Sequence, residues 1–149
     1  MQWVIGVDPD SEKFGVAIYQ DGALWELKML PLIELVLMAE CFKDNVLVSI
    51  ENVMINQFVY TRNRKASKAA QSKVAMSIGR CQQAQVELQR MLDHYEIPYV
   101  LHRPQSGNWA DNRALFEKVT GWKGNSNPDT RSASYFGFLA INQSLKGQK

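Results

Sequence analysis

The chain has 149 residues and a mass of 17.0 kDa, which suits a single domain large enough to bury a hydrophobic core. With 46% hydrophobic and 21% charged residues, and no apolar run near the roughly 18 residues of a membrane helix, its composition excludes a membrane-spanning protein. The N-terminus has no basic segment and meets an acid at Asp8, so we expect no secretory signal. The two cysteines, Cys41 and Cys81, form no CxxC pattern, and we expect both to be buried apolar residues of a cytoplasmic protein.

The net charge of +2 is distributed unevenly along the chain. The segment from Asn52 to Val86 contains no Asp or Glu, yet it holds these basic residues: Arg62, Arg64, Lys65, Lys68, Lys73 and Arg80. A solvated helix face usually mixes both signs, because opposite charges four residues apart stabilise a helix. A segment of one sign therefore favours contact with a polyanion over a merely solvated face.

Three strands are predicted within the first thirty residues, over 2–8, 14–19 and 23–29. The turn Gln20-Asp21-Gly22 is typical of a hairpin, so these strands should pair as an antiparallel meander. Pro31 suits the first turn of a helix that ends near residues 43–45. The apolar run 46–51 is then typical of a strand buried on both faces.

Residues 52–65 are predicted to form an exposed loop, followed by a long helix over 66–94. Its apolar stripe comprises Val74, Ile78, Cys81, Leu88 and Leu92, and Gln85 interrupts it.

A fifth strand is expected over 97–101, a helix near 111–119, and a last helix capped by Asp129 and Thr130. The order β-β-β-α-β-α-β-α-α predicts an α/β fold: a five-stranded mixed sheet with helices on both faces. Residues 1–145 should form one domain, and residues 146–149 a short tail.

Three acids fall at the ends of these predicted elements. Asp8 ends the first strand, Glu51 ends the fourth, and Asp129 begins the last helix. Singly, they read as a turn residue, a strand-edge residue and a helix cap. If a crossover places the first and fourth strands side by side, the three carboxylates converge and repel one another unless cations neutralise them. Oxygen ligands of this kind suit Mg²⁺ or Mn²⁺.

Short motifs in the same order resemble those of RuvC-type Holliday-junction resolvases, which belong to the RNase H-like superfamily of nucleases. The resemblance spans nearly the whole chain and rests on these segments: Ile5-Gly6-Val7-Asp8-Pro9 with Phe14-Gly15-Val16-Ala17, Ile50-Glu51-Asn52-Val53, Ser72 to Cys81, Arg103-Pro104 with Trp109, Val119-Thr120-Gly121, and Asp129 to Ala133.

The resemblance implies an RNase H-like nuclease domain that cuts four-way DNA junctions by phosphodiester hydrolysis with two ions, Mg²⁺ or Mn²⁺, per active site. It implies that Asp8 bridges both ions, that Glu51 holds one, and that Asp129 holds the other with weak help from Ser132. It also implies a homodimer, because a junction needs two cuts related by symmetry.

Two positions depart from the family pattern. Asp10 follows Asp-Pro where the family has glycine, and Ser132 stands where the family has a carboxylate. A neutral hydroxyl is a weaker ligand than a carboxylate for a hard cation. Three accounts of Ser132 stay open: an enzyme that works with three carboxylates, a deliberate inactivating change, and a protein that only binds branched DNA. An alternative alignment takes Asp129 as the second acid and puts Ser126 in the first position.

The loop after Glu51 carries Phe58 and Tyr60 among basic residues, which suits stacking on unpaired bases; the alternative is that these aromatics cover the core. The predicted phosphate contacts are Arg62, Arg64, Lys65, Lys68, Lys73 and Arg80, with Lys118, Lys123 and Arg131 nearer the acids. We expect His94 and His102 to be structural or surface residues.

Two rival functions fit the same fold. One is a non-catalytic module that binds branched DNA, which Ser132 favours and the three acids oppose. The other is an RNase H-type nuclease that cuts RNA–DNA hybrids, which would accept linear hybrids and need no dimer. A compact single domain of this kind suits a bacterial or phage-infected cell.

Overall fold

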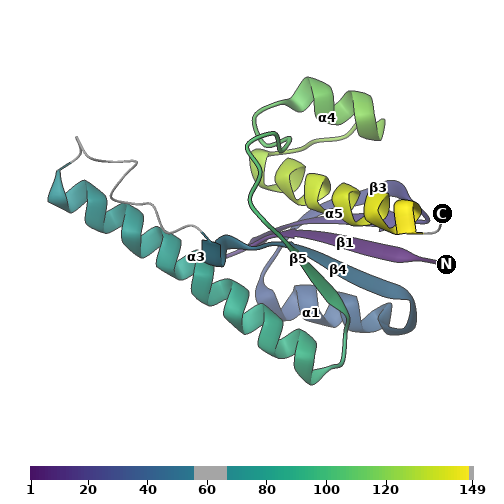
Figure 1. Cartoon of the computed structure of the whole chain (residues 1–149), viewed down its shortest axis with the longest axis horizontal. Coiled ribbons are helices and arrows are strands. Elements are labelled where there is room, and N and C mark those ends of the chain that lie inside the picture. The colour runs from purple at the N-terminus through teal and green to yellow at the C-terminus, as the bar shows by residue number, and fades with distance from the viewer. Residues whose placement is uncertain (56–66, 148–149) are drawn as a thin grey trace.

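A mixed five-stranded sheet forms the centre of the molecule, with helices on both faces (Figure 1). The computed structural model describes residues 1–55 and 67–147, and the side chains of residues 144–147 are left aside. Its elements are β1 Trp3–Asp8, β2 Phe14–Gln20, β3 Ala23–Leu30, α1 Leu32–Cys41, β4 Val46–Glu51, α3 Lys68–His94, β5 Tyr99–His102, α4 Arg113–Thr120 and α5 Pro128–Gly147, with 3-10 turns at Lys43–Asn45 and Val53–Ile55. The predicted α/β fold and element order are confirmed.

The strands lie in the order β3-β2-β1-β4-β5. β1, β2 and β3 form the predicted antiparallel meander, and the turn between β2 and β3 consists of Asp21 (φ 49°) and Gly22 (φ 86°). Asp-Gly is favoured there because both positions need positive φ. β4 and β5 run parallel to β1, as connections through α1 and α3 require.

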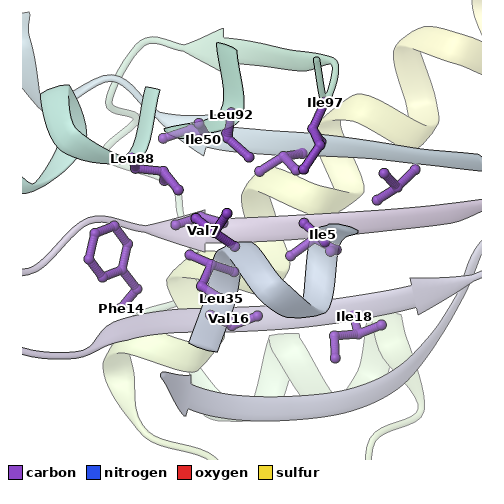
Figure 2. Packing of buried hydrophobic residues seen from close by; sticks show 14 residues of the cluster. Ile5, Val7, Phe14, Val16, Ile18, Leu35, Ile50, Leu88, Leu92 and Ile97 are labelled. Atoms are coloured by element: carbon purple, nitrogen blue, oxygen red, sulfur yellow. The ribbon is translucent and has the colours of Figure 1, made fainter. Parts of the chain in front are cut away.

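The two faces of the sheet carry different cores. Alternate residues such as Ile5, Val7 and Ile50 pack against α1 and α3, where Leu35, Leu88 and Leu92 are fully buried (Figure 2). On the other face α5 packs against β1 and β2 through a smaller cluster: Val4, Ala17, Tyr19, Ala133 and Ala140.

Helix α5 approaches the sheet very closely. A Cβ on Gly6 would clash with the carbonyl of Ala133, and a Cβ on Gly137 would lie 2.7 Å from the Tyr19 ring. Two buried hydroxyls fasten the helix: Tyr19 donates to the carbonyl of Ser134 at 2.7 Å, and Ser49 donates to the carbonyl of Phe136 at 2.6 Å.

Helix α3 packs on the sheet only through its C-terminal half, and its N-terminal half projects beyond the sheet (Figure 1). The predicted stripe is therefore correct for Leu88 and Leu92 but wrong for Val74, which is 37% exposed because no core lies opposite it.

Several smaller expectations change. The predicted loop begins with the turn Val53–Ile55, in which Val53 is buried, and residues 56–65 of that loop lie outside the described residues. Cys41 is exposed and Cys81 is half-buried, so the expected burial of both cysteines is wrong. Helix α5 extends to Gly147, into the expected tail. None of the helices within the described residues is both long and apolar enough to cross a membrane.

Candidate active site

Asp8 and Glu51 end neighbouring parallel strands on the same face of the sheet. The register pairs Val7 with Ile50, so the next residues, Asp8 and Glu51, stand side by side. Val7 and Ile50 point into the core under α1 and α3. Because side chains alternate along a strand, both carboxylates face the side covered by α5. The expected neighbouring placement of these two strands is confirmed.

A glycine on β2 allows Asp129 to lie close to Asp8 and Glu51. Gly15 pairs with Asp8 across the β1–β2 ladder, and a Cβ on Gly15 would clash with the main chain of Asp129 and lie 3.0 Å from its Cβ. Only a residue without a side chain allows the start of α5 to lie this close to the sheet. Gly15 was part of the first motif, but its role as the contact point for Asp129 was not predicted.

The cap of α5 is Asn127, which leaves the Asp129 carboxylate free for the site. Asn127 Oδ1 accepts from the Thr130 amide at 2.8 Å, and Thr130 Oγ1 accepts from the Asn127 amide at 3.0 Å. Pro128 fills the first helical position, where its missing N–H costs nothing. The prediction that Asp129 caps the helix is wrong, although Thr130 does take part. Asparagine before proline with a polar partner three residues later was a signal available in the sequence.

The carboxylates perturb one another. Burial first, and then the charges of Glu51, Asp129 and Asp10, raise the pKa of Asp8 to about 8, while a hydrogen bond from Ser132 opposes the rise. Burial raises the pKa of Glu51, again opposed by Ser132. Burial and the charge of Asp10 raise the pKa of Asp129. The fold therefore opposes ionisation of all three carboxyl groups.

Ser132 lies one turn after Asp129 on α5, is buried, and donates through Oγ to Glu51 Oε2 at 3.4 Å. It therefore supplies a neutral hydrogen-bond donor to Glu51 and Asp8, where another carboxylate would add repulsion.

A pocket of about 300 Å³ opens beside these groups. Its walls are Asp8, Pro9, Asp10, Val53 and Asp129 on one side and Ser77, Ile78 and Cys81 of α3 on the other. α3 therefore passes over the acids just where its projecting half begins.

A divalent cation fits this site by its donor chemistry. The carboxylates supply only hard oxygen atoms, and a bound cation would offset the burial, and at Asp8 and Asp129 also the like charge, that raise their pKa values. Within residues 1–55 and 67–147, no three or more His, Cys, Asp or Glu side chains are close enough together to hold an ion as they stand.

The predicted DNA-contacting residues fall into three groups. The group in the loop after Glu51 lies outside the described residues: Phe58, Tyr60, Arg62, Arg64 and Lys65. Lys68, Lys73 and Arg80 are exposed on the projecting half of α3, and Lys118 and Lys123 are exposed on or just after α4.

Arg131, which was predicted to contact DNA near the acids, is largely buried. It is 9% exposed; its Nε and Nη2 donate to the carbonyl of Ala110 at 3.0 and 2.9 Å, and Nη1 donates to Ser126 Oγ at 3.0 Å. These bonds use three of the five N–H groups of the guanidinium, so Arg131 fastens the loop before α4 to α5. His102, which pairs with Glu51 across the β4–β5 ladder, is also buried, whereas His94 is exposed.

No family model and no curated protein matches the sequence. Among solved structures, the chain is similar to T. thermophilus RuvC in complex with a Holliday junction substrate, with a TM-score of 0.64 and 13% identity over 99% of this chain and 97% of that chain. It is also similar to a second structure of Thermus thermophilus RuvC, with a TM-score of 0.51 and 15% identity over 97% of both chains.

These likenesses define the class of the fold. The chain has an RNase H-like fold: an α/β domain built on a mixed five-stranded sheet. Within that class its architecture is the one seen in RuvC, with the whole chain included in the match.

Proposed function

We propose that this protein is a metal-dependent DNA endonuclease that cuts branched DNA, and four-way junctions in particular. The convergence of three carboxylates from β1, β4 and α5 carries the proposal. Burying such groups together destabilises a fold, as the raised pKa of Asp8 indicates, so their placement is explained better by catalysis than by stability. The likeness to RuvC, one of whose structures holds a Holliday junction, supports the choice of substrate.

In this proposal Asp8, Glu51 and Asp129 hold Mg²⁺ or Mn²⁺, with two ions per active site. When bound, the ions supply charge stabilisation for the scissile phosphate and activation of the attacking water. Ser132 keeps the Glu51 carboxylate oriented through its hydrogen bond. Because Ser132 contributes no charge, one of the two ions is held weakly.

The basic residues bind the DNA backbone. Lys68, Lys73 and Arg80 extend away from the acids along α3, and Lys118 and Lys123 lie on the side of α4. We further propose that Arg62, Arg64 and Lys65 add phosphate contacts and that Phe58 and Tyr60 stack on unpaired bases at the junction. Two symmetric cuts require a two-fold homodimer, and the reaction belongs in the cytoplasm of a bacterial or phage-infected cell.

A second function has a specific observation in its favour. A protein that binds branched DNA without cutting it would explain why a hydroxyl, not a carboxylate, bonds Glu51 on the α5 side.

The deciding experiment compares the wild-type chain, Ser132→Asp and Asp8→Asn on a labelled mobile four-way junction in Mg²⁺ and in Mn²⁺. We expect paired symmetric nicks from wild type, faster cutting by Ser132→Asp, and binding without cutting by Asp8→Asn. If wild type and Ser132→Asp bind the junction but neither cuts it, the DNA-binding module is correct. Linear RNA–DNA hybrid serves as the control substrate. If the chain cuts this hybrid in preference to the junction, the substrate is an RNA–DNA hybrid and not a four-way junction. Failure of all variants to bind branched DNA would refute both functions.

A further inference from the structure

A glutamine occupies one of the three fully buried positions of the long helix α3. Gln85 has no exposed surface and lies in line with Leu88 and Leu92, which are equally buried. A leucine or methionine there would continue the apolar stripe, whereas a buried amide costs stability unless all its hydrogen bonds are made. The reason for a glutamine must therefore lie in what its amide binds.

The amide of Gln85 binds the residues that directly follow Glu51. Its Oε1 accepts from the Val53 amide at 2.8 Å, and its Nε2 donates to Asn52 Oδ1 at 3.0 Å. The same Nε2 donates to Gln89 Oε1 at 3.0 Å, which holds the Gln85 side chain in place from one turn further along α3.

The segment after Glu51 is held from a second direction as well. The Asn52 amide donates to the carbonyl of His102 on β5 at 2.7 Å, and Gln82 Nε2 donates to the carbonyl of Val53 at 3.2 Å. The main chain leaving Glu51 is thus fixed between β5 and the side-chain amides of α3. A rotation of α3 would move Asn52 and Val53, and with them the backbone that orients the Glu51 carboxylate.

We propose that Gln85 is a positioning residue that sets the orientation of Glu51 through Asn52 and Val53, and so couples α3 to metal binding. This inference rests on the proposed nuclease function. The N-terminal half of α3 carries Lys68 and Lys73. A DNA strand bound there therefore contacts the same helix whose C-terminal half holds Asn52 and Val53, the residues that follow Glu51.

The test uses Gln85→Met, which preserves size and helix propensity but removes the amide. Its matched control is Gln83→Met, since Gln83 is exposed on the same helix and bonds Glu87 on the surface at 2.8 Å. Asn52→Ala removes the Asn52 side chain, which bonds Gln85, but leaves Gln85 as acceptor for the Val53 amide. Together with the two single variants, the double variant Asn52→Ala/Gln85→Met completes a double-mutant cycle. The measurements on the full chain are Mn²⁺ affinity by calorimetry without DNA, the single-turnover cleavage rate at saturating junction, junction Kd, and Tm.

We expect Gln85→Met to weaken Mn²⁺ binding by about 10-fold or more, as loss of a partner that orients a metal ligand does elsewhere. The single-turnover rate should fall in parallel and partly recover at high Mn²⁺, while junction Kd stays within about twofold of wild type, since no phosphate contact is lost. Gln83→Met should match wild type. In the Asn52→Ala background, Gln85→Met should weaken Mn²⁺ binding by less than it does in the wild-type chain, because only the bond to the Val53 amide is then left to lose.

A Gln85→Met protein with wild-type Mn²⁺ affinity and only a lower Tm would overturn the proposal and make Gln85 a structural residue. Should Gln85→Met fail to fold, Asn52→Ala tests the coupling through Asn52: wild-type Mn²⁺ affinity in that variant overturns the role of Asn52 in the proposal, and weaker affinity supports it. A wild-type chain that neither binds Mn²⁺ nor cuts refutes the proposed function itself, and the coupling falls with it.

Discussion

Replacing Asp8 by asparagine removes the carboxylate whose ionisation the fold opposes most strongly. The pKa of Asp8 is raised to about 8 by burial and by the charges of Glu51, Asp129 and Asp10. In the unfolded chain the same group loses its proton near pH 4. Between these two values the folded protein keeps a proton that the unfolded chain has released, so the free energy of unfolding falls as pH rises through this window.

The size of the effect follows from the width of the window. Stability should fall by roughly 1.4 kcal/mol per pH unit, or about 4 kcal/mol between pH 5 and pH 8. For a chain of this length that is about 8 to 16 °C in Tm. The raised pKa values of Glu51 and Asp129 act in the same direction. Asp8→Asn is isosteric and neutral, so it should lose most of this slope and be more stable than wild type at pH 8.

Thermal melts followed by circular dichroism in EDTA, from pH 5 to pH 8.5, measure this slope. The exposed Asp111→Asn is the matched control and should follow the wild-type profile. Mg²⁺ or Mn²⁺ added at pH 8 should raise the Tm of wild type, because the ions bind the deprotonated carboxylates, but have little effect on Asp8→Asn. A metal-free wild-type Tm that is flat or rises from pH 5 to 8, or an Asp8→Asn profile identical to wild type, would refute the electrostatic reasoning.

Three further changes test other parts of the structure. Gly15→Ala should lower the free energy of unfolding in urea by about 1–3 kcal/mol and weaken Mn²⁺ binding, because the added Cβ displaces Asp129. The control is Gly79→Ala, whose Cβ meets no atom within 4 Å and which should stabilise α3 by about 0.5–1 kcal/mol. Equal effects of the two substitutions would contradict the close approach of α5 to Gly15. Arg131→Met should lower Tm but leave the salt dependence of junction binding unchanged, and a shallower salt dependence would show that this residue contacts phosphate. Lys73→Ala should reduce the slope of log Kd against log salt by about one, the loss of one phosphate contact, and leave Tm unchanged within error. An unchanged slope would show that Lys73 does not contact DNA.

The topology was predictable because its signals are local. Alternating or continuous apolar runs, an Asp-Gly turn and proline at a helix start act within a few residues, and each strand and helix appeared where these patterns placed it. The end positions of Asp8 and Glu51 on their strands follow from the same runs. Once β1 and β4 are neighbours with Val7 opposite Ile50, the two acids lie side by side.

Other features depend on partners distant in the sequence. Gln85 reads as a defect in an apolar stripe until Asn52 and Val53 are seen beside it. Arg131 reads as a surface cation until the carbonyl of Ala110 is found against it. The burial of a polar side chain is decided by hydrogen-bond partners that another segment supplies, and no local pattern encodes them.

The sequence by itself therefore determined the element order, the mixed sheet and the acids that end its strands, since periodicity and turn chemistry are properties of neighbouring residues. Only the tertiary structure decided that Gly15 lets Asp129 reach Asp8 and that Ser132 bonds Glu51. It also decided which half of α3 is covered. The physical reason is close packing, because whether two segments touch depends on the shape of the surfaces between them.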